Sequence, residues 1–566
     1  MAKLKIFETK YGLAWVLLIL LAINLLASFW HVRLDLTAEK RFTLSEATRN
    51  LLSRVDTNLH VQVFLKGNYP SGFKKLSGAT EDILHSFKEI AGNHLQYEFI
   101  SPEEIVEGSS TSYADTISQM GIYPINLTSQ VAQGQQQQYV FPAALLHYRG
   151  RVLPVLLYQG KTPMINFQEL SSAEAMLEYN LANAIAKITQ TEKPVIGYAV
   201  GNGQPVDHRT YDLVENVLSP NYALYTFDPN IQPMIPLQFD LLMLVKPTIP
   251  FSETAKLKLD QYVMNGGKII WFIDRLNAEM DSLRAGEVIA YDRELNLNDI
   301  LFKYGVRVNP DLVMDLQCDY LPFDVSGNGQ FELLPWNYFP LIGSQNNHPI
   351  NKNLGFVASR FINSIDTVQA EGIRKTVLLA SSANARTIST PALISGRENS
   401  IEPENEKFNR AHIPLAVLLE GKFTSLYRNR VSQSIQDTLQ KYDLSFLPQS
   451  IQENKMIVVS DGDMVLNDVV QGSTPIPMGM NPFTYGTQRE FPFANKDFLQ
   501  NCIDYLINEN GLYEAKSKDY ILRLLDSNKK EEQRFFWQIV NIGLPVFAIL
   551  IFAVLFQWIR RRKYAN

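Results

Sequence analysis

Two apolar stretches near the ends of this 566-residue chain limit its fold more than any other feature. The first covers Leu13–Trp30 and the second covers Phe535–Ile559. Each has the roughly 18–25 apolar residues that a helix needs to cross a hydrocarbon layer of about 30 Å. We therefore predict transmembrane helices at residues 13–31 and 535–559, which leaves about 500 residues of ordinary globular sequence between them.

Basic residues indicate how these helices are oriented. Lys3, Lys5 and Lys10 come before the first stretch, and Arg560–Lys563 follows the second. Positive charge next to a membrane span tends to stay on the cytoplasmic side. We expect residues 1–12 and the basic tail 560–566 to be cytoplasmic. The body between them is then a periplasmic domain, held at two points on a bacterial inner membrane.

Each apolar stretch has a competing interpretation. The first resembles a signal peptide, but its core is longer than the usual 7–15 or so residues, and no small-residue cleavage site follows Phe29-Trp30. The second is a buried core helix if its basic tail lies on a protein surface. Its aromatic ends, including Trp537 and Trp558, fit the two faces of a membrane better.

Composition limits the partners and the chemistry of the body. Without the two ends, the chain holds 45 Lys or Arg and 57 Asp or Glu, a formal charge of −12. An acidic body without basic runs argues against nucleic acid as a partner, because phosphates require basic patches. Cys318 and Cys502 exclude a disulfide scaffold and a cysteine zinc site. They leave open one disulfide or two buried free thiols.

Residues 32–190 predict a small N-terminal α/β domain. Apolar periodicity indicates strands and helices in β-α-β order, followed by a hairpin around Arg149-Gly150 and a long helix. We read Thr43 with Glu46, and Ser171 with Glu174, as helix-starting capping boxes. The glutamine run Gln135–Gln138 is expected to be a solvated loop. The predicted strands and helices are His60–Leu65, Ala79–Ile90, Leu95–Ile100, Tyr139–His147, Val152–Tyr158 and Glu169–Thr189.

Residues 191–515 predict a second, larger α/β domain. Short apolar strands alternate with helices, which is typical of mostly parallel sheets flanked by helices. An insertion over residues 319–453 is expected to be rich in loops, and residues 516–534 are expected to form a juxtamembrane helix. The predicted strands are Val195–Val200, Ala223–Phe227, Asp240–Val245, Lys268–Ile273 and Lys455–Ser460; the predicted helices are Tyr211–Leu218, Ser252–Asn265, Leu295–Gly305 and Asp497–Ile507.

A glycine-containing turn ends the first strand of this domain, where open α/β sheets bind ligands. The turn is Gly201, Asn202, Gly203 and Gln204, so we take these four residues as candidate ligand-binding residues. Val206 stands where a dinucleotide-binding fingerprint has its third glycine. A plain tight turn is the competing interpretation.

Carboxylates follow two later strands of the same domain. Asp274 comes after one strand, and Asp461 and Asp463 come after another. Paired carboxylates hold a divalent cation or perform acid–base chemistry, so these three are also candidate ligand-binding residues. A calcium loop needs further oxygen ligands, which the residues after Asp463 do not supply. Asp207-His208 was weighed as a metal or base pair against exposed loop residues; no metal site is predicted.

Motifs for catalysis are missing from the sequence. It has no P-loop, no G-x-S-x-G elbow and no H-x-x-x-H pair. We therefore predict that the chain is not an enzyme and carries no cofactor.

An ordered series of segments gives the chain a family resemblance. It resembles the auxiliary-component family of ABC-type transport systems, and within it the gliding-motility-associated (GldG-type) proteins of Bacteroidetes. No single segment is highly specific, but the series covers nearly the whole chain. The matching segments are Asp35-Leu36-Thr37 with Phe42–Ser45, Val195–Gly203, Phe239–Pro247, Gly266–Lys268 with Asp274, Val458–Asp463 and Asn495–Phe498.

The resemblance implies a partnership with a cytoplasmic ATPase subunit and an ABC permease subunit, and a role in gliding motility. It also implies a central domain similar to a glutamine-amidotransferase-like sheet that serves binding. This family commonly has Gly-His-Gly-Glu at the turn that is Gly201–Gln204 here, so the turn has neither the imidazole nor the carboxylate. The chain lacks nucleotide-binding motifs and has too few spans to form a channel. Both features agree with separate partners that supply the ATPase and the channel.

Two alternatives stay open at this point. The first is a periplasmic enzyme that acts on glycan or lipid through strand-end carboxylates such as Asp274 and Asp461. The second is a pure scaffold for surface machinery that binds no small ligand. The sequence identifies no transported substrate.

Overall fold

The structure is a computed structural model of the whole chain, and the mixed α/β class is confirmed. Two compact units are distinguished, Met1–Lys518 and Asp519–Asn566. The residues described are 18, 20–22, 43–106, 108–120, 122, 124–131, 134–158, 167–280, 287–324, 328–344, 346–395, 405–430, 445–470, 472, 474–487, 489–507, 511, 512, 516 and 533–564. Most of the first predicted membrane span and most of the juxtamembrane segment lie outside them.

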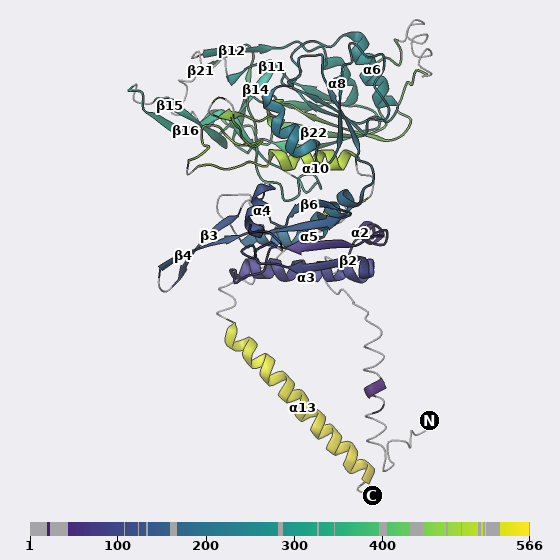
Figure 1. Cartoon of the computed structure of the whole chain (residues 1–566), viewed down its shortest axis with the longest axis vertical. Coiled ribbons are helices and arrows are strands. Elements are labelled where there is room, and N and C mark those ends of the chain that lie inside the picture. Colours follow the sequence, from purple (N-terminus) through teal and green to yellow (C-terminus); the bar gives the residue numbers. More distant parts are fainter. Residues whose placement is uncertain are drawn as a thin grey trace. The chain divides into compact units, whose positions relative to one another are not determined.

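The N-terminal part has a four-stranded sheet in the order β2-β1-β5-β6. Only the β1–β2 pair is parallel; β1–β5 and β5–β6 are antiparallel. Helices α3 and α5 contact each other and pack on this sheet (Figure 1). The elements are α2 (Glu46–Leu52), β1 (Leu59–Val63), α3 (Ser71–Ala91), η2 (Gly92–His94), β2 (Leu95–Phe99), α4 (Tyr113–Gln119), β3 (Ile125–Val131), β4 (Gly134–Val140), β5 (Ala143–Tyr148), β6 (Arg151–Leu156) and α5 (Phe167–Thr189).

Local patterns in this part were predictive in some places and wrong in others. The hairpin around Arg149-Gly150 is confirmed, and both turn residues have positive φ. The capping boxes are wrong: Ser45 caps α2 by accepting from the Thr48 amide, and Ser171 lies inside α5. The glutamine run is not a loop, because β4 pairs along its length with β3.

The central sheet has seven strands in the order β19-β22-β23-β10-β9-β7-β8. The run from β23 to β8 is parallel, and β22 and β19 add an antiparallel edge. "Mostly parallel" therefore describes this run only, since every other described pairing except β1–β2 is antiparallel. The bounds are β7 (Val195–Ala199), β8 (Ala223–Phe227), β9 (Leu241–Val245), β10 (Ile269–Phe272), β19 (Ile373–Ala380), β22 (Pro414–Gly421) and β23 (Asn454–Val459).

Helices cover both faces of the central sheet, which explains why its strands are continuously apolar. All five residues of β9 are buried. Met243 belongs to the core with α10 (Asn495–Ile507), whereas Leu242 and Leu244 belong to the core with α6 (Glu253–Met264). Successive strand residues point to opposite faces, so each face needs its own apolar cover.

The expected helices of the central part are present with small shifts. Helix α8 (Asn298–Tyr304) ends at Gly305, which has φ 111° as a left-handed cap. The segment before β8 is not an α-helix but η3 (His208–Thr210) followed by the π-helix η4 (Asp212–Leu218). η6 (Asn405–Lys407) and η7 (Asp463–Val465) are short 3-10 turns.

The predicted insertion over residues 319–453 contains a series of strands in its described parts, so the expectation of a loop-rich region is wrong there. Its hydrophobic cluster centres on Trp336, which is fully buried and has ring contacts with Phe339 and Phe361. Two of these strands, Cys318–Asp324 and Phe331–Ile342, contain Pro, which breaks their alternation, and several others have only two to five residues. The remaining strands are β11 (Leu276–Asn277), β12 (Glu287–Asp292), β13 (Val306–Val308), β14 (Asp311–Asp315), β15 (Cys318–Asp324), β16 (Phe331–Ile342), β17 (Val357–Ala358), β18 (Ile365–Thr367), β20 (Ala385–Ser389), β21 (Ala392–Ser395), β24 (Val469–Val470) and β25 (Thr474–Pro475).

The C-terminal unit contains α13 (Arg534–Tyr564), with Pro545 inside it. Over Phe535–Arg562 this helix is long and apolar enough to cross a membrane, with a mean hydropathy of 2.7 in its most apolar window and none of that window buried. The interpretation as a buried core helix does not fit, because the side chains of α13 are exposed. In the body, Cys318 and Cys502 are buried free thiols, so they form no disulfide.

Candidate functional site

The carboxyl ends of β9, β10 and β23 meet at one edge of the central sheet. These strands are parallel neighbours, so the residues that follow them come together. Lys246 directly follows β9. Asp274 follows β10, and Asp461 follows β23, each with one residue between the strand and the aspartate. The structure thus brings together the three carboxylates that the sequence singled out, and it adds a lysine.

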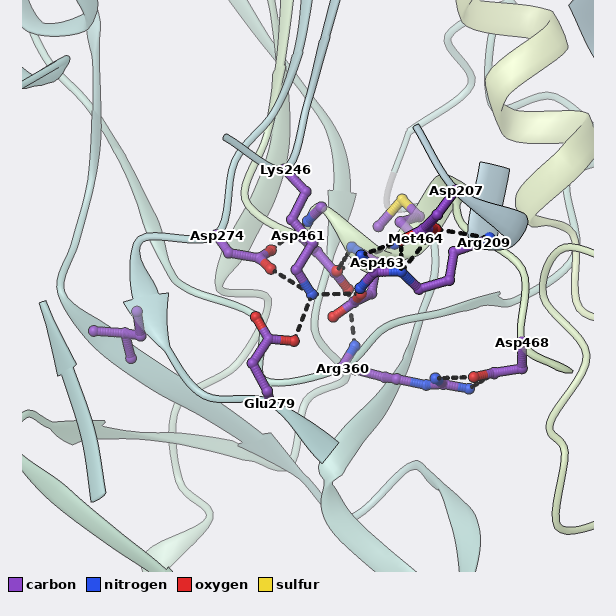
Figure 2. Close-up of polar contacts among 12 residues, drawn as sticks. Asp207, Arg209, Lys246, Asp274, Glu279, Arg360, Asp461, Asp463, Met464 and Asp468 are labelled. Carbon is purple, nitrogen blue, oxygen red and sulfur yellow. Dashed lines mark hydrogen bonds and ion pairs between the residues drawn. The ribbon is translucent and has the colours of Figure 1, made fainter. Parts of the chain in front are cut away.

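Lys246 is the centre of this site, which we call the Lys246 cluster: Lys246, Asp274, Glu279, Asp461 and Asp463. Its Nζ lies 2.6 Å from Asp463, 2.9 Å from Glu279 and 3.2 Å from Asp274 (Figure 2). The side chain is only 4 % exposed. Burial alone lowers the pKa of a lysine, but the surrounding carboxylates outweigh it and raise the pKa of Lys246 above its usual value.

Asp461 is held differently from the other carboxylates. It accepts backbone N–H bonds from Asp463 at 2.8 Å, from Met464 at 3.2 Å and from Arg360 at 2.8 Å. It is fully buried. These bonds fix the loop after β23 and tie it to the segment that carries Arg360.

The three aspartates have different pKa directions. Burial raises the pKa of Asp274 despite Lys246. Burial, and then the charges of Asp274 and Asp463, raise the pKa of Asp461 well above its usual value. Burial also opposes ionisation of Asp463, but the Lys246 ammonium outweighs it and holds the pKa of Asp463 below its usual value.

Arginine pairs surround the cluster. Arg293 lies 2.7 Å from Glu279, and the Arg360 guanidinium is paired with Asp468 (Figure 2). Arg209 pairs at 2.8 Å with Asp207. Asp207 also accepts from the Arg209 amide, so the Asp207-His208 pair proposed from the sequence is an arginine partner and a local cap.

Gly462 is required by the close packing of the cluster. A Cβ added there would lie 2.6 Å from Lys246 Cβ and 2.9 Å from Lys246 Cα. Lys246 itself has a positive φ of 45°, which is uncommon for a residue with a side chain. The backbones of the loops after β9 and β23 are thus in close contact at Lys246 and Gly462.

The turn Gly201–Gln204 lies at the same edge but does not join the cluster. Its Asn202 carbonyl accepts from the amides of Thr248 and Ile249 at 2.8 and 3.0 Å, and Asn202 Nδ2 donates to the Pro250 carbonyl at 3.1 Å. Gly201 and Gly203 have φ of 94° and 74°, the left-handed region that favours glycine. Through these hydrogen bonds, the turn holds the loop after β9 in place.

The cluster is a closed assembly of charges. The cavity beside it measures about 30 Å³ and includes Arg360, Asp463 and Asp468 in its lining. That is room for about two water molecules. Within the described ranges, no group of three or more His, Cys, Asp or Glu residues is arranged to hold a metal ion. The geometry therefore suits a structural joint between the loops of the sheet edge.

Sequence reasoning missed Lys246, Glu279 and Arg360. The signal for Lys246 was present, because it follows an apolar strand just as Asp274 does. It was passed over because only carboxylates were sought at the strand ends. Arg360 comes from the insertion, 88 residues beyond β10, so only the folded chain places it here.

Comparison with known proteins places the chain in a family. A family profile described as "ABC-type uncharacterized transport system" matches residues 193–502, more than half of the chain and the whole of the cluster. The chain belongs to this family. A second profile, of a domain of unknown function, matches residues 38–147. The auxiliary part of the resemblance seen in the sequence is thereby confirmed at family level.

A curated relative and a solved structure show what this chain is similar to. An uncharacterized protein of Borreliella burgdorferi is 22 % identical in an alignment of 548 residues that covers 94 % of this chain and 94 % of the relative. A chain titled "mmIFT52 N-terminal domain" aligns with 55 % of this chain and 96 % of its own length, at 12 % identity and a TM-score of 0.31. At that score the structural likeness supports no statement about this chain.

Proposed function

We propose that this protein is a membrane-anchored, extracytoplasmic auxiliary subunit of an ABC transporter complex, with a non-enzymatic scaffolding or binding role. The family match over residues 193–502 carries the proposal, because it connects the body to transport systems. The apolar helix Phe535–Arg562 supports membrane anchoring. Its basic end, Arg560–Lys563, supports a cytoplasmic C-terminus and a periplasmic body.

The partners in this proposal are a permease subunit and a cytoplasmic ATPase subunit. Anchoring a large body beside a permease raises its effective concentration at that surface without any new contact. The ordered resemblance to gliding-motility proteins supports a role in gliding motility. The proposal leaves the transported substrate and the direction of transport open.

The closed Lys246 cluster favours a non-enzymatic role. A catalytic acid or base must reach a proton on its substrate within about 2.6–3.2 Å. Asp461 is fully buried and bonded to backbone N–H groups, and Asp463 is bonded to Lys246. The alternative, an enzyme that acts on glycan or lipid through Asp274 and Asp461, needs these groups exposed to a substrate.

Affinity isolation of the tagged full-length protein from native membranes in mild detergent tests the partnership. We expect a permease and an ATPase to accompany it, and both to be lost when α13 is replaced by an unrelated transmembrane helix. Isolation as a lone monomer in several mild detergents would contradict the proposal.

Protease treatment of intact spheroplasts tests the topology. We expect the body to be digested while an epitope at the C-terminus is protected. The opposite pattern, a protected body with a clipped C-terminus, would overturn the extracytoplasmic location.

A further inference from the structure

A groove of about 730 Å³ shares none of its lining residues with the Lys246 cluster. Its walls come from the segment after β10, from α8 and β13, and from the segment after β22. We call it the cationic groove and define it by Arg275, Asp299, Phe302, Lys303, Arg307 and Arg430. Grooves of about 300–1,000 Å³ are the usual size for sites that hold small organic ligands.

Three of its charged side chains are already neutralised by carboxylates or cations next to the groove. Arg275 holds Asp292 with two hydrogen bonds of 2.8 and 2.5 Å. Arg307 lies 2.9 Å from Asp366, and Asp299 lies 2.8 Å from Lys256. These pairs add no net charge, but they fix the two guanidinium groups in place.

Two cations are left over. Lys303 and Arg430 are exposed, and neither side chain has an ion pair or hydrogen bond in the part of the chain that the structure describes. Their two positive charges are not cancelled by the pairs named above. The body as a whole carries −12 between the two apolar ends, so these two cations have the opposite sign to the net charge of the body.

The groove also offers an apolar wall. Phe302 is 52 % exposed although it belongs to α8, whose other apolar residues Ile300 and Leu301 are buried. An exposed ring between a lysine and arginines suits a ligand with both a carbon skeleton and charged groups.

We propose that the cationic groove binds an organic anion that carries at least two phosphate or carboxylate groups. Lys303 and Arg430 would neutralise two of these groups, and the fixed guanidinium of Arg307 would add further N–H donors, which suit both oxyanions. The carbon skeleton of the ligand would lie against Phe302. This inference goes beyond the auxiliary role, because it gives the body a ligand of its own.

Titration calorimetry on the full-length protein in detergent tests the groove, with tripolyphosphate and hexaglutamate as probes. We expect saturable binding of one or both, and the stronger probe identifies the oxyanion. The variant Lys303→Ala/Arg430→Ala should bind the stronger probe at least about tenfold more weakly, because it loses two charge-assisted contacts.

Two further variants distinguish binding in the groove from non-specific attraction of the anion to surface charge. Arg49→Ala/Arg54→Ala removes two exposed cations of the N-terminal part and should leave the affinity unchanged. Lys303→Arg/Arg430→Lys keeps both charges and should bind within about threefold of the unmodified protein. All these side chains are exposed, so equal thermal unfolding midpoints are expected and show that folding is intact.

The inference is overturned if neither probe binds saturably at millimolar concentration, if the groove variant binds as tightly as the unmodified protein, or if the control variant loses as much affinity. Co-isolation with a permease and an ATPase is measured separately and should be the same for the groove variants. Failure of anion binding with intact co-isolation overturns the groove alone, and the reverse result overturns the partnership alone.

Discussion

Two buried lysines in this protein have opposite electrostatic behaviour. Lys246, 3 % exposed, lies at the edge of the central sheet against three carboxylates. Lys516, 1 % exposed, donates to the amide oxygen of Asn501 on α10 and lies 5.0 Å from the ring centre of Tyr179 on α5. Carboxylates raise the pKa of Lys246, whereas burial lowers the pKa of Lys516 to about 7.

The comparison teaches that the balance between burial and nearby carboxylate charge decides in which direction the pKa of a buried lysine shifts. Asp504 and Asp497 are near Lys516, but their charges offset only part of the burial effect. Asp504 is already bonded to Lys187 at 2.9 Å and to Tyr222 at 2.8 Å. A Lys516 that titrates near pH 7 makes this seam between α5 and α10 sensitive to pH near neutrality, whereas the raised pKa of Lys246 keeps that lysine charged there.

The largest expected effect is at Lys246. Lys246→Met removes the cation that contacts Asp274 and Asp463 in a buried site, whereas Glu279 keeps Arg293, so the free energy of unfolding should fall by about 3–5 kcal/mol. Thermal unfolding of the full-length protein measures this, with hydrogen exchange over β9, β10 and β23 as the local readout. An unchanged midpoint would show that the cluster does not hold the sheet edge together.

The next effect concerns the pH dependence at Lys516. Its folded pKa of about 7 lies below the usual lysine value, so between about pH 7 and 10 the unfolded chain binds a proton that the folded chain does not. The free energy of unfolding should therefore rise with pH in this window, by up to about 1.4 kcal/mol per pH unit, and this gain is lost as the pH falls to 7.

Lys516→Met should remove that slope, because its side chain does not titrate. Thermal unfolding and hydrogen exchange of α5 and α10 at pH 7, 8 and 9 measure the effect, with the exposed Lys422→Met as the matched control. A slope of equal size in Lys516→Met and in the unmodified protein would assign the pH dependence to another group.

A smaller loss is expected from Gly462→Ala. The new Cβ would lie 2.6 Å from Lys246 Cβ and force the two loops apart, at a cost of about 1–2 kcal/mol in unfolding free energy. Gly78→Ala is the control: this exposed glycine of α3 has open space around it, so the change should stabilise by about 0.5–1 kcal/mol. Equal effects of the two changes would argue against tight packing at Lys246.

The smallest expected effect is that of Asp461→Asn, within about 1 kcal/mol. The amide gives up one of the backbone N–H bonds but also removes a charge beside Asp274 and Asp463. Asp463→Asn should cost more, because it removes a direct partner of Lys246. If Asp461→Asn or Asp274→Asn folds, reaches the membrane and yet abolishes function in cells, the enzymatic alternative gains support.

Prediction from the sequence succeeded where one local signal dominated. Apolar runs located β9, β10 and β23, the turn residues located the Arg149-Gly150 hairpin, and the strand-end rule located Asp274 and Asp461. It failed in the insertion, where short strands and strands interrupted by Pro have no clear alternation. It also failed at helix starts, because Ser45 was passed over in favour of Thr43.

The sequence by itself determined the apolar helix of the C-terminal unit, the acidic body, the α/β class and the carboxylates at the strand ends. These follow from composition and periodicity, which act over a few residues. Only the tertiary structure decided that Lys246 neutralises those carboxylates, that Arg360 reaches them from the insertion, and that Lys303 and Arg430 share one groove. Such pairings join segments far apart in the chain, and local patterns carry no information about which distant charges meet when the sheet forms.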